Sequence, residues 1–566
     1  MSRIIKRRYF LIFITALVFL SLVGCSSNVG QSTGGADSTK SANNKEGSSN
    51  VVTTVGTESQ EPVTITYWCR LQAPDVYTSN ADMICYQVAS EKTGITIEWI
   101  HPPKGQENEQ FSLMVASKEL PDIIEHSWLS YPGGPQAAIE TGIIQDITDE
   151  IEQYMPNYTA YLNAYPEIRK MVATDEGIQY NIPYIFTHTP SDSKRWGTVL
   201  EREPISETYV GLIIRQDLLD ELNLDKPETI DQMYDVLMAF KEHGVEYPFS
   251  TTESFLLQSQ IFASAFDIVS NGFYLDGEEV KYGPAEQNYF EYLKVLNKFC
   301  SSGLLDPDYP AMDNTENIAK ITSEKTGMWI GYYSSYLNNL YEQVISQNPS
   351  SSFYPVGLAN PVLTEGQQLK YVQADYSYRG QGAAITTSNR HVKESLTYLD
   401  WAFSEEGDKV MNWGVENDTY VMKDGWPSLT EKVINDEDGL GLATAIQKYT
   451  RKNGPLCMDY YNRLILGKFT KTEEGLKALG IWMSERNGTV PAGLPPITHT
   501  LDESDRVAAL SNEISTYVSE ARTQFVMGSR PLTESEFNNY IKTLESMGLS
   551  EFIKLKQAAY DRYKAR

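Results

Sequence analysis

The sequence predicts an α/β protein of two or more lobes that contain parallel β-sheet. Between residues 63 and 124, segments rich in β-branched and aromatic residues alternate with helical segments, and this alternation is typical of a parallel sheet. The chain has 566 residues. Even the part that follows residue 61 is too long for a single hydrophobic core, so we expect at least two lobes.

The elements of the first lobe follow one another regularly. Residues 63–68 (VTITYW) form the expected first strand, because β-branched and aromatic residues favour strands. The next expected elements are a helix at about 82–93, ended by Gly94, a strand at 95–100, a helix at about 107–117 and a strand at 120–124.

Later segments continue the mixed pattern. Thr229 is a plausible N-cap for a long amphipathic helix that runs to Lys241. The other expected elements are a hairpin around 175–184, strands at 211–215, 327–331 and 382–385, a helix at 216–222, further helices to about 300, and helices from about 504 to 566.

The first 25 residues carry an export signal. Arg3, Lys6, Arg7 and Arg8 precede an apolar run at 9–23, a pattern typical of a secretory signal peptide. That run is too short to span a bilayer comfortably, which takes about 20 residues. Its end, Leu-Val-Gly-Cys, resembles the lipobox of bacterial lipoproteins, which predicts that Cys25 becomes a lipid-modified N-terminus.

Residues 26–61 are expected to be a flexible tether. They are rich in Ser, Gly, Asn and Thr and contain almost no large apolar residue, so they cannot bury enough apolar surface to order themselves. No later segment has 18 consecutive apolar residues, so we expect the membrane contact to be through the lipid anchor only.

Composition limits the classes of function. The net charge of -28 argues against nucleic-acid binding, which needs a basic surface. The 36 Tyr, 19 Phe and 9 Trp supply aromatic faces on which sugars stack, although most of them are expected to pack in the core.

The remaining cysteines and the acidic segments indicate no resident metal. Cys69, Cys85, Cys300 and Cys457 are widely spaced, so they are expected to be buried thiols, with a Cys69–Cys85 bridge left open. The acidic run that ends at Gly439 fails as a calcium loop, because its first and twelfth positions are Ile and Ala.

Several segments together resemble the extracellular solute-binding protein family 1 of ABC importers, in its large carbohydrate-type lipoprotein branch. The matching segments are LMVASKELPDII (113–124), IRQDLL (214–219) with 231–240, GLLDPD (303–308), FSEEG (403–407), WGVE (413–416) with Tyr420, FVMG (525–528) and QAAYDR (557–562). They extend from near residue 63 to the C-terminus.

The resemblance implies a two-lobed, periplasmic-binding-protein-like fold of the type II class, whose hinged lobes close on a ligand. Residues 1–25 would be the signal peptide, 26–61 the tether and 62–566 the solute-binding domain. The first lobe would comprise about 62–185 and 372–430, and the second about 186–371 and the helices at 431–566. The resemblance also implies that the protein docks on permease subunits and performs no covalent chemistry. We therefore expect no catalytic residue and no cofactor.

Ligand-binding residues are expected among the aromatic and polar residues at strand ends and in hinge loops. In open sheets, ligands bind beyond the carboxyl ends of the strands, where aromatic faces stack on sugar rings and polar groups bond their hydroxyls. The candidates are Trp68, Glu125, Trp128, Tyr184, Trp196, Ser250, Thr251, Tyr332, Tyr333, Tyr376, Tyr378 and Arg379.

The sequence therefore predicts a monomeric, lipid-anchored binding protein for an oligosaccharide on the outer face of the cell membrane. Its acidic composition makes a uronate-rich ligand less expected, although Arg195, Arg215 or Arg379 could reverse this locally. Some alginate-binding relatives carry a calcium loop that residues 172–180 lack, so no metal is expected there. A peptide or another organic solute, a surface glycoside hydrolase or lyase, and a sensor role stay open as alternatives.

Overall fold

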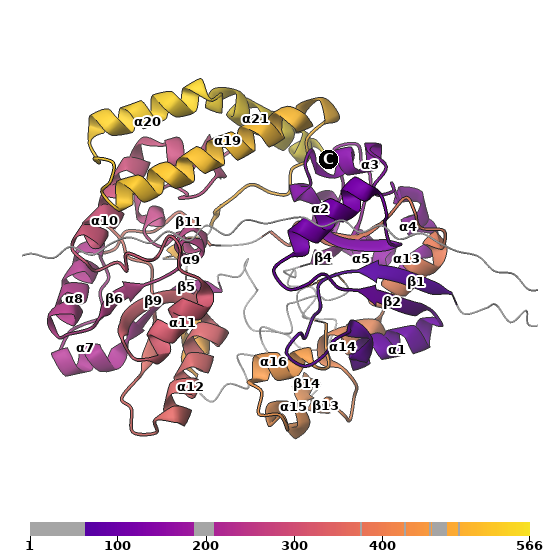
Figure 1. Ribbon diagram of the computed structural model, residues 1–566, viewed down its shortest axis with the longest axis horizontal. Helices are drawn as coiled ribbons and strands as arrows, with labels where there is room; N and C mark the ends of the chain where they lie inside the picture. The colour runs from indigo at the N-terminus through magenta and orange to yellow at the C-terminus, as the bar shows by residue number, and fades with distance from the viewer. Residues whose placement is uncertain are drawn as a thin grey trace, which may run out of the picture. The chain divides into compact units, whose positions relative to one another are not determined.

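Two β-sheets, each covered by helices, form the framework of the computed structural model (Figure 1). The structure describes residues 63–185, 209–373, 376–423, 426–451, 454–455, 473–484, 487–488 and 490–566. Residues 60–566 form one compact unit. No helix among the described residues has the length and apolar character needed to cross a membrane.

The first lobe contains a five-stranded sheet in the order β2-β1-β3-β12-β4. β1 pairs in parallel with β2 and with β3, as the alternating pattern predicted, while β12 lies antiparallel between β3 and β4. The strands are β1 (Thr64–Trp68), β2 (Thr96–Ile100), β3 (Ile123–Ser127), β4 (Ile182–Ile185) and β12 (Tyr378–Ile385).

The third strand begins later than expected, at Ile123. Asp122 does not continue the strand, because its Oδ2 accepts hydrogen bonds from the backbone N–H and the Oγ1 hydroxyl of Thr66, at 2.8 and 2.7 Å.

Helices cover this sheet and complete the first core. The helices are α1 (Ile84–Thr93), α2 (Glu107–Ser117), α3 (Gly134–Glu140), α4 (Thr148–Tyr154), α5 (Pro156–Ala164), α6 (Pro166–Val172), α13 (Val392–Trp401) and α14 (Glu405–Trp413).

The second lobe contains a four-stranded sheet in the order β10-β5-β9-β6. β5 runs antiparallel to both neighbours, and β6 pairs in parallel with β9. The strands are β5 (Val210–Arg215), β6 (Tyr247–Ser250), β9 (Thr326–Tyr332) and β10 (Pro355–Leu358). Its helices are α7 (Gln216–Leu222), α8 (Ile230–Glu242), α9 (Glu253–Ser259), α10 (Gln287–Ser301), α11 (Asn314–Thr322), α12 (Asn339–Gln347) and α18 (Glu474–Trp482).

The start of α8 confirms the predicted N-cap. Thr229 Oγ1 accepts a hydrogen bond from the backbone N–H of Gln232 at 3.2 Å, and Gln232 Oε1 accepts from the backbone N–H of Thr229 at 3.1 Å. This reciprocal capping box satisfies two N–H groups that the helix leaves unbonded, and such a cap contributes about 1 kcal/mol.

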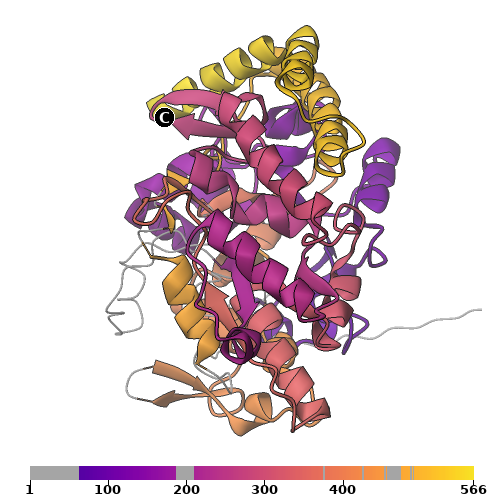
Figure 2. The ribbon, with the colours of Figure 1, turned by 90° about the vertical axis from the view of Figure 1, so that its left-hand side faces the viewer.

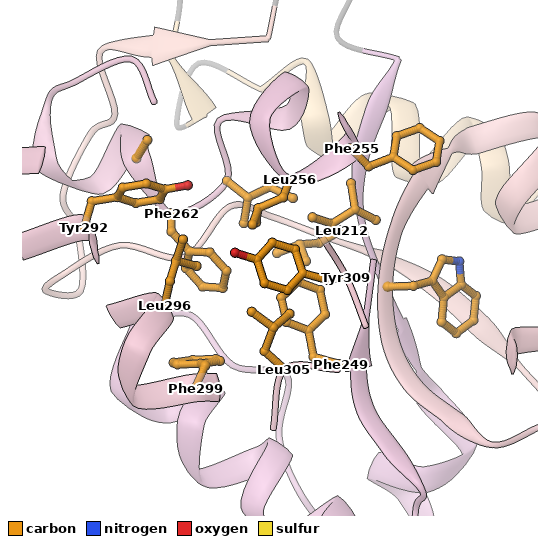
Figure 3. Packing of buried hydrophobic residues seen from close by; sticks show 14 of the residues in the cluster. Leu212, Phe249, Phe255, Leu256, Phe262, Tyr292, Leu296, Phe299, Leu305 and Tyr309 are labelled. Atoms are coloured by element: carbon orange, nitrogen blue, oxygen red, sulfur yellow. The ribbon is translucent and has the colours of Figure 1, made fainter. Parts of the chain in front are cut away.

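The core of the second lobe is rich in aromatic residues. Phe249 of β6 and Leu212 of β5 pack with side chains from α9 and α10 around Tyr309, as Figure 3 shows. Phe262 lies edge-on to both Phe249 and Phe299, with ring centroids 6.1 and 5.3 Å apart. Many of the aromatic residues counted in the sequence therefore serve packing.

The C-terminal helices α19 (Leu501–Val526), α20 (Glu534–Ser546) and α21 (Leu549–Ala565) pack on this second core. α21 also lies along the hairpin of β7 (Phe273–Asp276) and β8 (Glu279–Tyr282), where Gln557 Oε1 accepts from the Val280 N–H at 2.7 Å (Figure 2). At its end, Arg562 and Arg566 each bond the carboxylate of Asp175 at 2.6 Å.

A small subdomain follows α14 and contacts the segments just before it. It consists of β13 (Tyr420–Lys423), β14 (Trp426–Leu429), α15 (Glu431–Ile434) and α16 (Leu442–Gln447). Lys432 bonds Asp418 at 2.8 Å, and the Arg451 N–H bonds Met411 O at 2.8 Å. Both partners lie in the segment 372–430 that is expected in the first lobe. The expected division of the chain into lobes, with residues from 431 onward in the second lobe, stays a prediction.

Arg451 fastens this subdomain to the first sheet. Its side chain is fully buried, and its Nη2 bonds Glu125 Oε1 and Oε2 at 2.7 and 2.6 Å. Its Nη1 donates to the Tyr86 hydroxyl at 2.7 Å, and the Tyr67 hydroxyl donates to Glu125 at 2.7 Å. Each buried charge thus has the partners it needs to offset its loss of hydration.

The Arg451→Met variant should be strongly destabilised, because it leaves the Glu125 carboxylate buried without its cation. We expect the free energy of unfolding in urea to fall by about 3–5 kcal/mol. The double variant Arg451→Met/Glu125→Met should recover part of this loss. Arg506→Met is the matched control, because the Arg506–Glu551 pair is about half exposed. Equal effects of Arg451→Met and Arg506→Met would contradict the account.

Candidate functional site

Strand direction places several loops at one edge of the first sheet. β1, β3 and β4 end there, because all three run the same way, and the antiparallel β12 begins there. Arg379, at the start of β12, therefore lies at the edge where parallel strands present ligand-binding loops.

The second sheet presents a corresponding edge. β6 and β9 end on it, and β5 begins on it, with Val210 paired to Tyr332. Tyr209, directly before β5, thus stands beside the last residue of β9. Gly331 makes the following π-helical turn η6 (Tyr333–Asn338) possible, because a Cβ on Gly331 would lie 2.3 Å from Tyr336 Cβ.

Tyr209 and Tyr332 form a stacked pair at this edge. Their ring centroids are 5.7 Å apart and their planes differ by 16°. Phe255 meets Tyr332 edge-on at 5.2 Å. Tyr209 is buried and Tyr332 is half-buried. The pair has the shape of the aromatic face that a sugar ring prefers.

Polar side chains from both lobes converge on Tyr209. Arg379 Nη1 of the first lobe donates to the Tyr209 hydroxyl at 3.2 Å, and Gln258 Nε2 of the second lobe donates to the same oxygen at 3.2 Å. The Tyr209 N–H donates to Gln373 Oε1 at 3.2 Å. Arg379 and Tyr332, both predicted from the sequence, thus meet through a residue that the sequence analysis missed.

A cavity of about 550 Å³ adjoins this cluster. Its polar lining consists of uncharged amide and hydroxyl groups, which can donate and accept hydrogen bonds in the directions that sugar hydroxyls need. Gln260 Oε1 accepts from the Ser270 N–H at 2.7 Å, which fixes one wall. The lining residues are Ser254, Leu257, Gln258, Gln260, Asn271, Gln373 and Ala492.

Other predicted site residues lie inside the cores. Trp128 is fully buried and its Nε1 donates to Gly382 O at 3.1 Å. Ser250 is also fully buried and bonds Asn317 and Asp306 at 3.0 and 3.2 Å. The same holds for Tyr378, whose hydroxyl is bonded by Tyr180 and Asn181, both at 2.9 Å. The other buried members are Trp68, Tyr184, Thr251 and Tyr333.

These buried residues can reach a ligand only if their surroundings rearrange. Position at a strand end does not tell which side of the sheet a side chain takes, which is why the sequence grouped them with Tyr332. The carboxylate of Glu125 is bonded to Arg451, as described above. Tyr376 is half-buried, and this burial raises the pKa of its hydroxyl. Trp196 lies outside the described residues. The ligand-binding role of each predicted residue stays a prediction.

The sequence analysis missed Tyr209, Gln258 and Gln373. Tyr209 directly precedes a strand that was predicted correctly, so asking which strands begin at the binding edge would have found it. Gln258 lies in a helix and Gln373 next to the two-residue strand β11 (Tyr371–Val372), and neither carries a recognisable signal.

Asp175, within residues 172–180, has protein cations as partners. Asp175 bonds Arg562 and Arg566. Among the residues the structure describes, no group of three or more His, Cys, Asp or Glu side chains could hold a metal ion.

Cys69 and Cys85 are both free and buried, and burial raises the pKa of the Cys85 thiol to about 12.

His126, within β3, packs against Phe111 of α2. Their ring centroids are 3.6 Å apart and the planes differ by 9°. Burial lowers the pKa of His126 to about 4, which keeps the imidazole neutral at pH 7. The neutral ring therefore fits the apolar wall behind the edge of the first sheet.

Comparison with known proteins identifies the family. A family model described as bacterial extracellular solute-binding protein matches residues 84–409. The chain belongs to this family. The match confirms the resemblance and the two-lobed fold inferred from the sequence.

Curated relatives of this solute-binding protein align over most of its length. The fructooligosaccharide ABC transporter substrate-binding protein FusA of Streptococcus pneumoniae serotype 4 is 26% identical over 516 residues, covering 86% of this chain and 88% of FusA. The polygalacturonan/rhamnogalacturonan-binding protein YtcQ of Bacillus subtilis is 22% identical over 496 residues, covering 83% of this chain and 86% of YtcQ.

Solved structures share the fold of this solute-binding protein. The alginate-binding protein AlgQ2 without calcium ion has a TM-score of 0.72 and 20% identity, covering 89% of this chain and 99% of that one. FusA in complex with kestose has a TM-score of 0.69 with the same identity and coverage.

The half-buried His126 should make stability pH-dependent. Its folded pKa of about 4 lies below the value of about 6.5 of a free histidine, so the unfolded state binds the proton first and stability falls with pH below about 6.5. From pH 7 to pH 5 the His126 contribution should fall by about 2 kcal/mol. His126→Phe should flatten the fall measured by urea unfolding, and His243→Phe, with a more exposed ring, should not. An unchanged pH profile in His126→Phe would contradict this.

Proposed function

We propose that this chain is a lipid-anchored extracellular binding protein that captures an oligosaccharide and delivers it intact to the permease of an ABC transporter. The observation that carries the proposal is the meeting of the two lobe edges at Tyr209. There, Tyr209 stacks on Tyr332 and accepts hydrogen bonds from Arg379 and Gln258, and Gln258 also lines a cavity of amide and hydroxyl groups.

The chemistry of this site suits a sugar better than a peptide. An aromatic face matches the C–H face of a pyranose or furanose ring, while amides and hydroxyls match its hydroxyl rim. A peptide with free termini would require charged partners, and the described lining of the cavity has none. The names of the relatives agree, since FusA is named a fructooligosaccharide ABC transporter substrate-binding protein and YtcQ a polygalacturonan/rhamnogalacturonan-binding protein.

The proposed mechanism is closure of the lobes on the ligand. Arg379 and Tyr209 belong to different lobes and are bonded to each other, so a ligand seated beside them contacts both lobes. A ligand that contacts both lobes favours the closed arrangement by its differential affinity. The closed form would then dock on the permease, and the chain itself would catalyse no reaction.

Extracellular anchoring rests on the N-terminal sequence. The apolar run and the Leu-Val-Gly-Cys segment precede the tether, and the 22% identical Lipoprotein LipO of Bacillus subtilis is a named lipoprotein relative. Two acyl chains give stable anchoring, whereas one is marginal.

A thermal-shift screen of residues 60–566 against plant, host and microbial oligosaccharides should give a rise in melting temperature for one glycan class, because ligand that binds only the folded state stabilises it. Tyr332→Ala should weaken that binding at least tenfold by removing the sugar-stacking face, corresponding to about 1.4 kcal/mol. Tyr341→Ala is the control, since Tyr341 lies on α12 and its ring meets Tyr354 edge-on, with centroids 6.2 Å apart.

The glycan is recovered and sized after the screen. Intact glycan supports the importer component, and cleaved glycan would move the function to a hydrolase or lyase. Shifts with peptides and with no glycan would overturn the oligosaccharide proposal.

Cys25→Ala should release the protein from the membrane fraction into the medium or leave it as unprocessed precursor, because the acceptor sulfur is gone. Fractionation and labelling with a palmitate analogue measure this in intact cells. Cys300→Ala is the control, because Cys300 is a half-buried thiol of the folded lobe. Label that persists in Cys25→Ala would exclude this anchor.

A further inference from the structure

A second cavity, of about 500 Å³, lies at the carboxyl ends of β1 and β2 in the first lobe. This cavity and the amide-lined cavity of the second lobe have no lining residue in common. We propose that this cavity binds a carboxylate group of the transported oligosaccharide, so that the ligand is an acidic sugar chain. This proposal rests on the proposed function and specifies its substrate class.

The cations that line this cavity carry the inference. Arg70 follows β1 and Lys104 follows β2, and both side chains are exposed. Neither forms a hydrogen bond or ion pair through its charged group with a described residue. In a chain of net charge -28, two cations that converge on one cavity without a protein carboxylate bonded to them are available for an anion. Arginine suits a carboxylate because its guanidinium makes two parallel hydrogen bonds.

One carboxylate also lines the cavity. Glu107, at the start of α2, has a lowered pKa, chiefly because its carboxylate accepts the N–H of its own backbone, with a further contribution from the Gly105 N–H and from the charge of Arg70. The backbone N–H groups at the start of α2 thus stabilise the Glu107 carboxylate. The three charged groups of the cavity leave one excess positive charge.

The walls between the cations are held in place. His101 Nδ1 lies 2.8 Å from Cys69 O, and the Asn80 N–H donates to His101 Nε2 at 3.1 Å. Because Nε2 accepts, the proton lies on Nδ1 and the ring is neutral. Asn80 Oδ1 also accepts from the Gln72 N–H at 3.0 Å. The loops that carry Arg70 and Lys104 are therefore preorganised, which lowers the cost of ordering them on binding.

The three arginines named in the sequence analysis do not supply such an unbonded charge at a cavity. Arg215 is already paired with Asp217, with Nε 2.7 Å from Oδ1, and Arg379 bonds Tyr209. Arg195 lies outside the described residues. Arg70 and Lys104 are thus two available cations that line one cavity of the first lobe, while the second-lobe cavity presents groups that suit hydroxyls. The ligand that fits both has uncharged sugar hydroxyls and at least one carboxylate.

The test uses a panel of uronic-acid oligosaccharides of several linkages, each paired with its carboxyl-reduced, uncharged counterpart, titrated calorimetrically into residues 60–566. We expect an acidic member to bind at least about tenfold more tightly than its reduced partner, as charge-assisted hydrogen bonds predict. That difference should shrink with added salt, which screens exposed charges.

The variant Arg70→Gln/Lys104→Gln should remove this preference and leave the affinity for the reduced partner unchanged. Arg390→Gln/Lys393→Gln makes the same change in net charge at exposed positions outside the cavity and should have no effect. Neutral glycans that bind as tightly as acidic ones, with no effect of Arg70→Gln/Lys104→Gln, would overturn the inference and leave the proposed function standing. Binding of no glycan, acidic or neutral, would overturn both.

Discussion

The insertion of β12 into the first sheet is the constraint on which the binding edge depends. The chain reaches β12 only after completing the sheet of the second lobe, and β12 then pairs between β3 and β4. Its first residues must therefore stand beside the second lobe. This puts Arg379 within hydrogen-bonding distance, 3.2 Å, of Tyr209, whose neighbour β5 belongs to the other sheet. A site that joins two lobes follows from this order of strands.

The two halves of the proposed site are built by different means. At the second-lobe edge, aromatic stacking and amide groups surround Tyr209 and Tyr332. At the first-lobe edge, hydrogen bonds of His101 and Asn80 hold the loops that carry cations. Behind them, the buried Arg451–Glu125 pair fastens the small subdomain to the sheet. Because a buried ion pair gains little over apolar packing but is costly to break, it fixes this arrangement more than it adds stability.

The sequence predicted most elements and the family, and it named only some residues of the candidate site. Periodicity and capping located α2, α8 and β5, because local preferences agree with the fold there. Strand-end reasoning located Tyr332 and Arg379. It also selected Trp128, Ser250 and Tyr378, which are buried, because a strand end does not determine which side chain faces outward. Gln258 and Arg70 depend on loops and helices brought together by tertiary packing, which a single sequence does not encode locally.

The central claim is that ligand binds where Tyr209, Tyr332 and Arg379 meet. A crystal structure of residues 60–566 with the oligosaccharide selected by the binding screen tests it most directly. We predict a sugar ring against Tyr332 and hydroxyl groups bonded to Gln258, with the glycan uncleaved. A ligand bound elsewhere, with Tyr332 and Gln258 untouched, would contradict the claim.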